Sequence, residues 1–367
     1  MSTAPHSPIR FVDLARQQQR IRDRIDAAIA RTLDHGQYIM GPEIGELEAA
    51  LGSFCGARNA VAVSSGTDAL ALVLMAKEVG PGQAVFCPAF TFVATAEVVA
   101  WLGATVYFVD VAEDTYNIDP QSLKQAIGEA RKAGHQPVGI IPVDLFGLPA
   151  DYAAIEPIAE AEGLWILSDA AQSFGSRYHE RAAGTCGLAT ATSFFPAKPL
   201  GCYGDGGAVV TDDTELAEVI RSLLVHGKGT SQYDNVRIGM TGRMDSIQAG
   251  ILIEKLKIFP EEIEMRNAVA RRYTEALSGA VETPVVPDGL QSVWAQYTVR
   301  TGGGRRDAIA AHLKENGVPV AIYYPTPLHR QTAYKHDPVA GNGLPVSDRI
   351  CNEVFSLPMH PYLDEET

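Results

Sequence analysis

Residues 83–111, QAVFCPAFTFVATAEVVAWLGATVYFVDV, decide the fold of this chain. The stretch begins with a short apolar segment, 83–88, continues with the helical apolar spacing of 91–103, and ends in a second apolar segment, 104–111. Gly103 closes the helical part, as glycine commonly does at a helix C-terminus. Short, almost wholly apolar strands that are separated by helices predict a parallel sheet covered on both faces.

The same alternation continues on both sides of this stretch. Helical patterns and short apolar segments follow one another at 67–79, 119–134, 137–147, 152–162 and 164–170. A helix to about His226 and a long helical region from Arg243 to about Gly279 follow. We therefore expect an α/β fold over residues 1–280, with a mostly parallel central sheet and helices on both faces. Residues 281–367 show strand, helix and strand patterns, which predict a smaller α+β C-terminal domain.

The bulk composition disfavours several classes of protein. A net charge of −14 does not suit a nucleic-acid surface, which needs a basic face, although a local pocket can still attract a phosphorylated ligand. The longest apolar stretch, VVAWLGATVYFV, is shorter than the roughly 20 residues of a membrane span. Residues 1–20 lack a signal-peptide pattern, and five widely spaced cysteines without a CxxC pair indicate reduced thiols. We therefore expect a cytoplasmic protein without membrane or nucleic-acid partners.

Several polar and aromatic residues directly follow the predicted strands. In open parallel sheets, ligands bind beyond the carboxyl ends of the strands, so these segments are the candidates for a site. Gly66 and Thr67, in VSSGTDAL, stand before a helix whose positive end could bind an anion. An ordinary capped helix start, with Thr67 and Asp68 as capping types, also explains this motif and is the more common use when the motif stands alone.

Asp169 ends a buried strand in LWILSDAAQSFG. A buried carboxylate is costly unless it faces a cation or a hydrogen-bond donor, and a protonated heterocyclic nitrogen is one suitable partner. A structural salt bridge or a helix cap is the alternative. In PAFTFVAT, Phe90 and Phe92 follow a strand and could stack on a planar ring, although core packing is the commoner use of such residues.

Lys198 lies in an unusually constrained segment, SFFPAKPLGCYGDGGAVV, at residues 193–210. Prolines and glycines on both sides of it restrict and place the backbone. A lysine that is partly removed from water has a lowered pKa, which makes its amine a nucleophile toward a carbonyl. The alternative is a stem packed on the surface with its ammonium in water, which is the usual arrangement for a lysine.

Together, these residues match the needs of one cofactor. An anion-binding loop, an aromatic ring, a buried aspartate and a constrained lysine all follow strands of one α/β domain, in that order. Pyridoxal 5′-phosphate requires a phosphate cup, a stacking ring, an acid at its pyridine nitrogen and a lysine for its aldehyde. The combination therefore predicts a pyridoxal-phosphate site.

The sequence resembles the DegT/DnrJ/StrS family of nucleotide-sugar aminotransferases, which are fold-type-I pyridoxal-phosphate enzymes. The resemblance extends over nearly the whole chain, from FVDL to SLPMHPYL. Its strongest marks are GPEIGELE, SSGTDAL, PAFTFVATAE, DTYNIDP, SDAAQSFGS, SFFPAKPLGCYGDGGA and YYPTPLHRQ.

The resemblance implies a role for each residue of this group. It makes Lys198 the lysine that forms the Schiff base with the cofactor, and Asp169 the partner of the pyridine nitrogen. Gln172 would lie near the ring hydroxyl, and Phe92 would stack on the ring. The cofactor phosphate would be held by Gly66, Thr67 and Ser193.

The resemblance also implies a homodimer whose active sites lie at the subunit interface. The neighbouring subunit would supply residues of RIGMTGRMDSIQAG, in which Thr241 stands where relatives usually carry the asparagine that contacts the cofactor phosphate. A hydroxyl can still donate one hydrogen bond, so we expect a retained but altered contact. Arg243 becomes a candidate for binding a substrate anion, with a salt bridge at the helix start as the alternative. Tyr323 and Tyr324 stand where many relatives read His-Tyr and are candidate substrate contacts.

The activity that the resemblance implies is transamination in two half-reactions. L-Glutamate would give its amino group to the cofactor, and the aminated cofactor would convert a keto-sugar to an amino-sugar, with Lys198 moving the proton. The segments SFFPAKPLGCYGDGG and GQYIMGPE look most like members acting at C3 of a UDP-linked 3-keto-sugar, such as a 2-acetamido-3-keto uronic acid. A dTDP-linked or other nucleotide-linked 4-keto or 3-keto-6-deoxy sugar is the alternative substrate.

Four other interpretations are weaker. AVSSG around Ser64 is close to the G-x-S-x-G elbow of serine hydrolases, but no later Asp and His are evidently paired with it. GCYGDGG imitates a dinucleotide loop but precedes a strand-like segment. Dehydratase relatives carry histidine in place of Lys198, and a non-enzymatic regulatory relative would not need the full set of cofactor residues. The histidines show no spacing typical of metal ligands, so no metal is expected.

Overall fold

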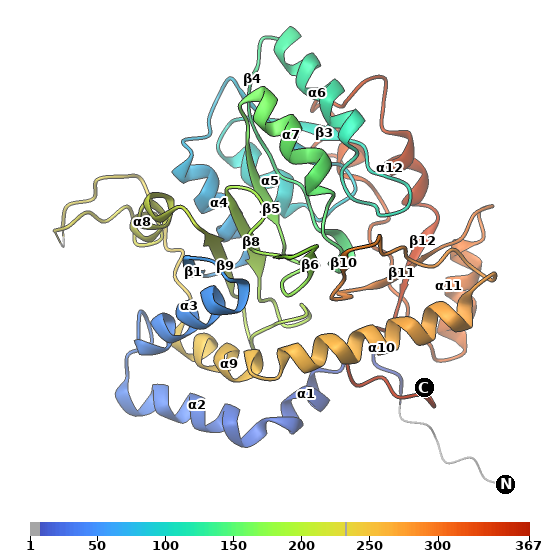
Figure 1. Ribbon diagram of the computed structural model, residues 1–367, viewed down its shortest axis with the longest axis horizontal. Coiled ribbons are helices and arrows are strands. Elements are labelled where there is room, and N and C mark those ends of the chain that lie inside the picture. Colours follow the sequence, from blue (N-terminus) through green and yellow to red (C-terminus); the bar gives the residue numbers. More distant parts are fainter. Residues whose placement is uncertain (1–7, 232) are drawn as a thin grey trace.

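A seven-stranded sheet forms the centre of the protein in the computed structural model, which describes residues 8–367 apart from residue 232 (Figure 1). The strand order is β1-β9-β8-β5-β4-β2-β3. These strands are β1 (Asn59–Val63), β2 (Gln83–Pro88), β3 (Thr105–Val109), β4 (Gln136–Ile140), β5 (Trp165–Asp169), β8 (Ala189–Ser193) and β9 (Gly207–Thr211). β9 runs antiparallel to β1 and β8, and the other neighbours are parallel. The predicted mostly parallel sheet is confirmed.

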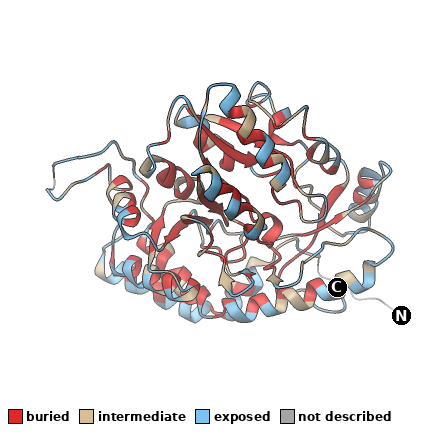
Figure 2. Ribbon diagram, turned by 45° about the horizontal axis from the view of Figure 1, so that its top comes forward, coloured by how far each residue is buried: buried red, intermediate tan, exposed pale blue. Residues whose placement is uncertain are grey.

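Helices cover both faces of the sheet, as predicted. The first face packs against α4 (Gly66–Ala76), α5 (Ala94–Trp101), α6 (Pro120–Lys132), α7 (Tyr152–Glu162) and α8 (Thr214–Leu223). The second packs against α3 (Pro42–Cys55), α9 (Ser246–Leu256) and α10 (Phe259–Leu277). Strand alternation separates the two cores, because Val61 and Val63 of β1 join the first and Ala60 and Ala62 join the second. Figure 2 shows the buried sheet between helices with exposed outer sides.

The predicted helical region from Arg243 to Gly279 consists of two helices, α9 and α10. Pro260 lies in the first turn of α10. A proline ring lacks the N–H that would continue the hydrogen bonds of α9, and it is well tolerated at a helix start. The chain therefore breaks between the two helices. On the outer side of α9 lies α2 (Arg22–His35), which follows the short α1 (Leu14–Arg20) (Figure 1).

Residues 281–367 form a second, smaller sheet. β11 (Tyr297–Arg300) pairs antiparallel with β12 (Val354–Leu357), and α11 (Arg306–Glu315) lies between them in the chain. The last expected strand, near 318–325, is reduced to one bridge between Ala321 and Ser356. Residues Leu328, Tyr334, Ala340 and Leu344 pack into the first core of the large sheet. The domain boundary at residue 280 stays a prediction.

The remaining elements are short. They are a three-stranded sheet of β6 (Arg177–Tyr178), β7 (Arg181–Ala182) and β10 (Leu290–Gln291), the helix α12 (Pro345–Ile350), and the 3-10 turns Leu145–Gly147 and Leu328–Arg330. In the part of the chain that is described, no helix is long and apolar enough to cross a membrane. The five cysteines are free and buried. Residues 1–7, part of the segment considered for a signal peptide, lie outside the described residues.

Candidate active site

The predicted site residues gather at one edge of the central sheet. β9 is antiparallel to both β1 and β8, so the carboxyl ends of β1, β2, β5 and β8 all lie at this edge. The register places Asp169 at the end of β5 opposite Ala191 of β8, two residues before Ser193. Segments far apart in the sequence are thereby brought together where open sheets bind ligands.

Asp169 and Lys198 interact through their opposite charges in this site. Only 5% of Asp169 is exposed, and its carboxylate accepts hydrogen bonds from Thr95 Oγ1 at 2.8 Å and from the N–H of Ala171 at 3.2 Å. Burial raises the pKa of Asp169, and these two hydrogen bonds and Lys198 oppose that shift. Burial lowers the pKa of the Lys198 amine, and Asp169 opposes the shift. The site therefore contains an amine poised for nucleophilic and proton-transfer chemistry beside a carboxylate that needs a cation.

Gln172 joins the large sheet to the C-terminal part of the site. Its Oε1 accepts a hydrogen bond from the N–H of Phe146 at 2.7 Å, and its Nε2 donates to the Tyr324 hydroxyl at 3.0 Å. The Tyr324 hydroxyl therefore receives one hydrogen bond and keeps its own proton free to donate. Burial raises the pKa of Tyr324, so this phenol stays protonated at neutral pH. Tyr323 contacts Phe11 edge to face, with the ring centroids 6.3 Å apart.

Phe92 and Phe90 play different parts, although both follow β2. Phe90 is fully buried in a small core with Phe146 and Tyr116. Phe92 is 53% exposed, and its ring centroid lies 6.5 Å from that of Tyr324. An aromatic face that remains exposed beside Tyr324 suits stacking on a planar ligand, which is the role predicted for Phe92.

Gly66 and Thr67 form the first turn of α4 instead of preceding it. The expected capping by Thr67 or Asp68 is wrong, because Ser65 is the N-cap and its side chain accepts from the N–H of Asp68 at 3.0 Å. Ser65 has the extended backbone that an N-cap requires. The amides of Gly66 and Thr67 have no partner within the helix, as is general for a first turn. These two amides remain available to an anion, and their binding of the cofactor phosphate stays a prediction.

Ser193 lies against Gly66. A Cβ added to Gly66 would lie 2.6 Å from the Ser193 Cβ, which is closer than real Cβ atoms approach. Gly207, directly opposite Ser193, is equally restricted, because its Cβ would lie 2.8 Å from the Gly66 nitrogen. Glycines at both positions let the helix start approach β8 and β9 closely. The three residues predicted to hold a phosphate, Gly66, Thr67 and Ser193, are thus adjacent.

Thr241 and Arg243 lie beside the end of β1 of the same chain. The N–H of Ser64 donates to the carbonyl of Gly242 at 2.9 Å, and Arg243 bridges Val63. The Thr241 hydroxyl lies 2.8 Å from Nε2 of His226. Among the described residues, the buried Nε of Arg243 has no protein hydrogen-bond partner, so no salt bridge at the helix start satisfies this atom. That group remains available to an anion.

Two weaker interpretations find no support in the geometry. The Ser64 hydroxyl donates to the carboxylate of Asp68 one helical turn away, so its partner is an acid and not the histidine base that a hydrolase needs. GCYGDGG runs into the antiparallel strand β9, whereas a dinucleotide loop opens a helix.

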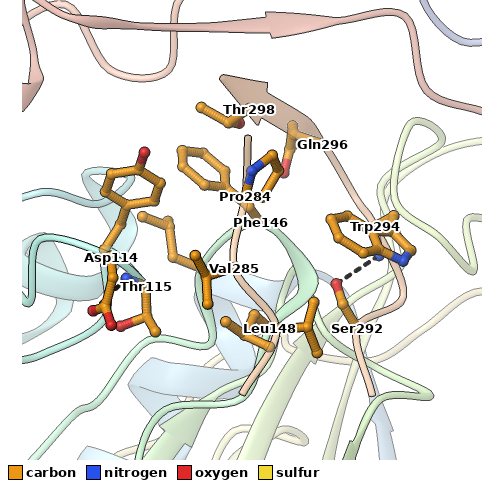
Figure 3. A pocket seen from close by; sticks show the side chains of 13 residues that line it. Asp114, Thr115, Phe146, Leu148, Pro284, Val285, Ser292, Trp294, Gln296 and Thr298 are labelled. Carbon is orange, nitrogen blue, oxygen red and sulfur yellow. Dashed lines mark hydrogen bonds between the residues drawn. The ribbon is translucent and has the colours of Figure 1, made fainter. Parts of the chain in front are cut away.

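A small cavity lies behind Phe146 at the junction with the C-terminal residues (Figure 3). Its volume is about 20 Å³, and its walls are formed mainly by Leu148, Val285, Trp294 and neighbouring side chains. Such a volume accommodates a water-sized molecule but not a sugar. This cavity is therefore too small to be the substrate site.

Sequence patterns missed two polar residues that support this site. Thr95, on α5, donates to Asp169 but is one of many helix threonines. Asp144 is 1% exposed, and its carboxylate accepts from the Tyr152 and Ser173 hydroxyls, each at 2.8 Å. Burial raises the Asp144 pKa to about 6. Its position after β4 in VDLFG, at the same edge as Asp169, was the available signal.

A family model for the DegT/DnrJ/EryC1/StrS aminotransferase family matches residues 19–367. The chain belongs to this family. It is 49% identical over 357 residues to the UDP-2-acetamido-2-deoxy-3-oxo-D-glucuronate aminotransferase of Pseudomonas aeruginosa, covering 97% of this chain and 96% of that protein. It is also 39% identical to a pleiotropic regulatory protein of Geobacillus stearothermophilus, covering 97% and 94%.

Solved structures agree with this assignment. A DegT/DnrJ/EryC1/StrS aminotransferase from Brucella abortus superposes with a TM-score of 0.96 at 52% identity, over 98% of this chain and 96% of that one. NtdA of Bacillus subtilis, solved with bound cofactor PMP, gives a TM-score of 0.89 at 28% identity, over 100% and 84%. The fold-type-I architecture predicted from the sequence is confirmed.

Proposed function

We propose that the protein is a pyridoxal-phosphate-dependent aminotransferase that converts a UDP-linked 3-keto-sugar to the amino-sugar, with L-glutamate as amino donor. The observation that carries the proposal is that the buried Asp169 carboxylate and the Lys198 amine interact through their charges at the edge of the sheet where β1, β2, β5 and β8 end. The UDP-3-oxo-sugar activity of the P. aeruginosa relative, which matches nearly the whole chain, supports the substrate class.

The residues of the site fit the cofactor. Bound pyridoxal phosphate supplies an aldehyde for amino-group transfer and a ring that accepts electrons. Asp169, a buried carboxylate with two neutral donors, would hold the pyridine nitrogen in its protonated form. The exposed face of Phe92 would cover the ring, and Gln172 would lie near the ring hydroxyl. The close approach of Gly66 to Ser193 forms the cradle for the phosphate.

Lys198 would act as the acid–base group of both half-reactions. Burial lowers the pKa of its amine, which makes the neutral, proton-accepting form more accessible. In the first half-reaction, Lys198 Nζ would take the proton from the α-carbon of the amino donor and pass it to the bound cofactor. In the second, it would take a proton back and deliver it to the sugar carbon that becomes the amine-bearing carbon. Tyr324 and Arg243 would orient the substrate, with Arg243 facing an anionic group and Tyr323 at the outer side.

The proposal is tested on the purified protein. We expect a yellow protein with a visible absorption band from the imine of pyridoxal phosphate, and borohydride should abolish this band by fixing the cofactor on Lys198. Peptide mapping then identifies the modified residue. A colourless protein that acquires no band with added pyridoxal phosphate would sink the proposal. In that case the regulatory alternative, to which the G. stearothermophilus relative belongs by name, gains support.

Gly66→Ala is expected to weaken cofactor binding by at least about tenfold, because the overpacked methyl group displaces Ser193 or the helix start and so widens the phosphate cradle. Titration of the cofactor-free protein with pyridoxal phosphate measures the affinity. Gly128→Ala in α6 is the matched control, since its added Cβ meets nothing within 4 Å. Wild-type affinity in Gly66→Ala would contradict the assigned phosphate cradle.

We also propose a homodimer with shared active sites. Large apolar side chains are exposed close to the site, and Ile39, which is 48% exposed, bridges Asp245 beside Arg243. The segment between α8 and α9 projects from the body and carries Ile238, which is 91% exposed (Figure 1). A second copy that covers these side chains would remove this apolar surface from water. Thr241 would then reach the partner's cofactor phosphate with its hydroxyl.

Ile238→Asp is expected to weaken the dimer by at least about tenfold, because a charge would replace an apolar side chain at the interface. Light scattering after gel filtration measures the mass, which for the wild type should be twice the 39.3 kDa of one chain. Trp101→Asp, at an exposed position on α5, is the control and should stay dimeric. A monomeric wild type with full activity would refute the shared site.

Because the cysteines of the enzyme are free thiols, we place it in the cytoplasm.

A further inference from the structure

The backbone around Lys198 forms a tight loop between β8 and β9. At the base of the loop, the N–H of Cys202 donates to the carbonyl of Phe194 at 2.7 Å. At Gly201 the chain passes so close to itself that an added Cβ would lie 2.5 Å from the carbonyl oxygen of Pro196. A loop that packs this closely on itself has little free space in which to rearrange. A displacement of residues 199–204 therefore moves Lys198 as well.

Helix α9 contacts the far side of this loop through two polar side chains. Gln248 Oε1 accepts a hydrogen bond from the N–H of Tyr203 at 2.8 Å. Lys255 Nζ donates to the carbonyl oxygen of Gly201. The two side chains are about two helical turns apart and therefore lie on the same face of α9. One face of a core helix thus binds the backbone that follows Lys198.

Lys255 is an unusual residue for such a buried position. It is 1% exposed, and its amine lies 4.9 Å from the centre of the Tyr203 ring. The ion pairs within the described part of the chain do not include it. Burial lowers its pKa to about 8, with Glu262 opposing the shift. A methionine of similar length would pack here without the desolvation penalty, so the contacts to the loop are what the amine adds.

We infer that Lys255, together with Gln248, is a positioning residue that fixes the loop after Lys198 on α9 and so directs the Lys198 amine toward Asp169. This inference rests on the proposed function, in which Lys198 is the reacting amine. Lys255 itself touches the loop backbone and not the reacting atoms. Its effect reaches the chemistry through the Gly201 carbonyl and the short chain between Gly201 and Lys198.

Lys255→Met tests the inference, because it keeps the length of the side chain and removes the donor. In the cofactor-free protein, the amides of residues 200–206 should exchange hydrogen about tenfold faster, as the loss of one charge-assisted hydrogen bond implies. In the loaded enzyme, kcat should fall roughly 10–100-fold with the KM for the amino donor nearly unchanged, because the amine is misplaced and donor binding is not. The pH midpoint of the cofactor absorbance should shift. Lys255→Arg, which restores a donor, should recover part of each loss.

Lys257→Met is the matched control. Lys257 lies one residue beyond α9, its side chain is 54% exposed, and it pairs with Glu254. Lys257→Met should exchange its amide hydrogens and turn over its substrates like the wild type. If Lys255→Met does not fold, Gln248→Leu removes the second contact and should give the same local acceleration. Wild-type exchange and spectra in the folded variants overturn the inference, as does an acceleration spread evenly over the whole protein.

The exchange measurement also separates this inference from the proposed function. A wild-type protein that never binds pyridoxal phosphate refutes the function, whatever Lys255 does. A wild-type protein that binds it, combined with an unchanged loop in Lys255→Met, refutes only the positioning role.

Discussion

Lys198→Ala is expected to lower the turnover of amino donor and keto-sugar by at least about 10⁴-fold, because one side chain supplies both the nucleophilic amine and the acid–base group. The rest of the site stays in place in this variant. Asp169 keeps its bonds to Thr95 and Ala171, and the Gly66 cradle does not involve the lysine. Pyridoxal phosphate should therefore still bind, but without a covalent link.

Three measurements on Lys198→Ala distinguish loss of chemistry from loss of the fold. Dialysis should remove the cofactor completely, borohydride should fix none of it, and a small alkylamine in the buffer should restore part of the proton transfer. Lys124→Ala, an exposed lysine on α6, is the matched control and should keep the wild-type activity. Full turnover by Lys198→Ala would refute the role of this lysine.

Local sequence patterns were sufficient to predict the sheet, and they indicated the candidate site residues, whose roles stay predictions. Apolar runs such as 83–88 and 165–169 are short, uniform and flanked by helix signals, so they specify buried parallel strands. Lys198 and Asp169 stand out because each is a costly residue at a strand end, and the topology places strand ends together. The resemblance to a known family added the roles of Gln172 and Ser193.

Contacts between distant segments could not be predicted in the same way. Lys255 and Gln248 read as an ordinary polar part of a helix, and their partners in the Lys198 loop lie about 50 residues earlier in the chain. Asp144 depends on hydroxyls from two other elements. No periodic pattern records such pairs, because one polar residue in an apolar helix is compatible with many partners. The N-cap of α4 was missed because Ser65, Thr67 and Asp68 all have capping propensity, and only the backbone decides among them.

The second large expected effect is the loss of turnover in Asp169→Asn, which removes a charge from a buried position. Asp169→Asn keeps the size of the side chain and its acceptor oxygen for one of the two hydrogen bonds. It cannot hold the pyridine nitrogen in the protonated form, so turnover should fall about 10²–10⁴-fold, as expected when a preorganised charge is removed from an active site. The affinity of the phosphate cradle should change little.

The same substitution should stabilise the cofactor-free protein. Burial raises the pKa of Asp169 above its ordinary value of 3.8, so the native state binds this proton more tightly than the unfolded state does. The contribution of Asp169 to stability therefore falls as the pH rises from 3.8 through the native pKa, and the penalty persists at pH 7. Asparagine carries no charge and therefore does not incur this penalty. The melting temperature of cofactor-free Asp169→Asn should exceed that of the wild type at pH 7, and the difference should shrink as the pH approaches 4.

Cofactor binding should act in the opposite direction and favour the wild type. The wild type gains an ionic partner for its buried carboxylate when the cofactor binds, whereas Asp169→Asn gains none, so added pyridoxal phosphate should raise the melting temperature of the wild type more. Asp288→Asn, at an exposed loop position, should behave like the wild type with and without cofactor. A cofactor-free Asp169→Asn that melts below the wild type at pH 7 would show that the carboxylate is satisfied by Thr95, Ala171 and Lys198 alone. Asp169 would then not need a cationic ring as its partner, even if the activity were lost.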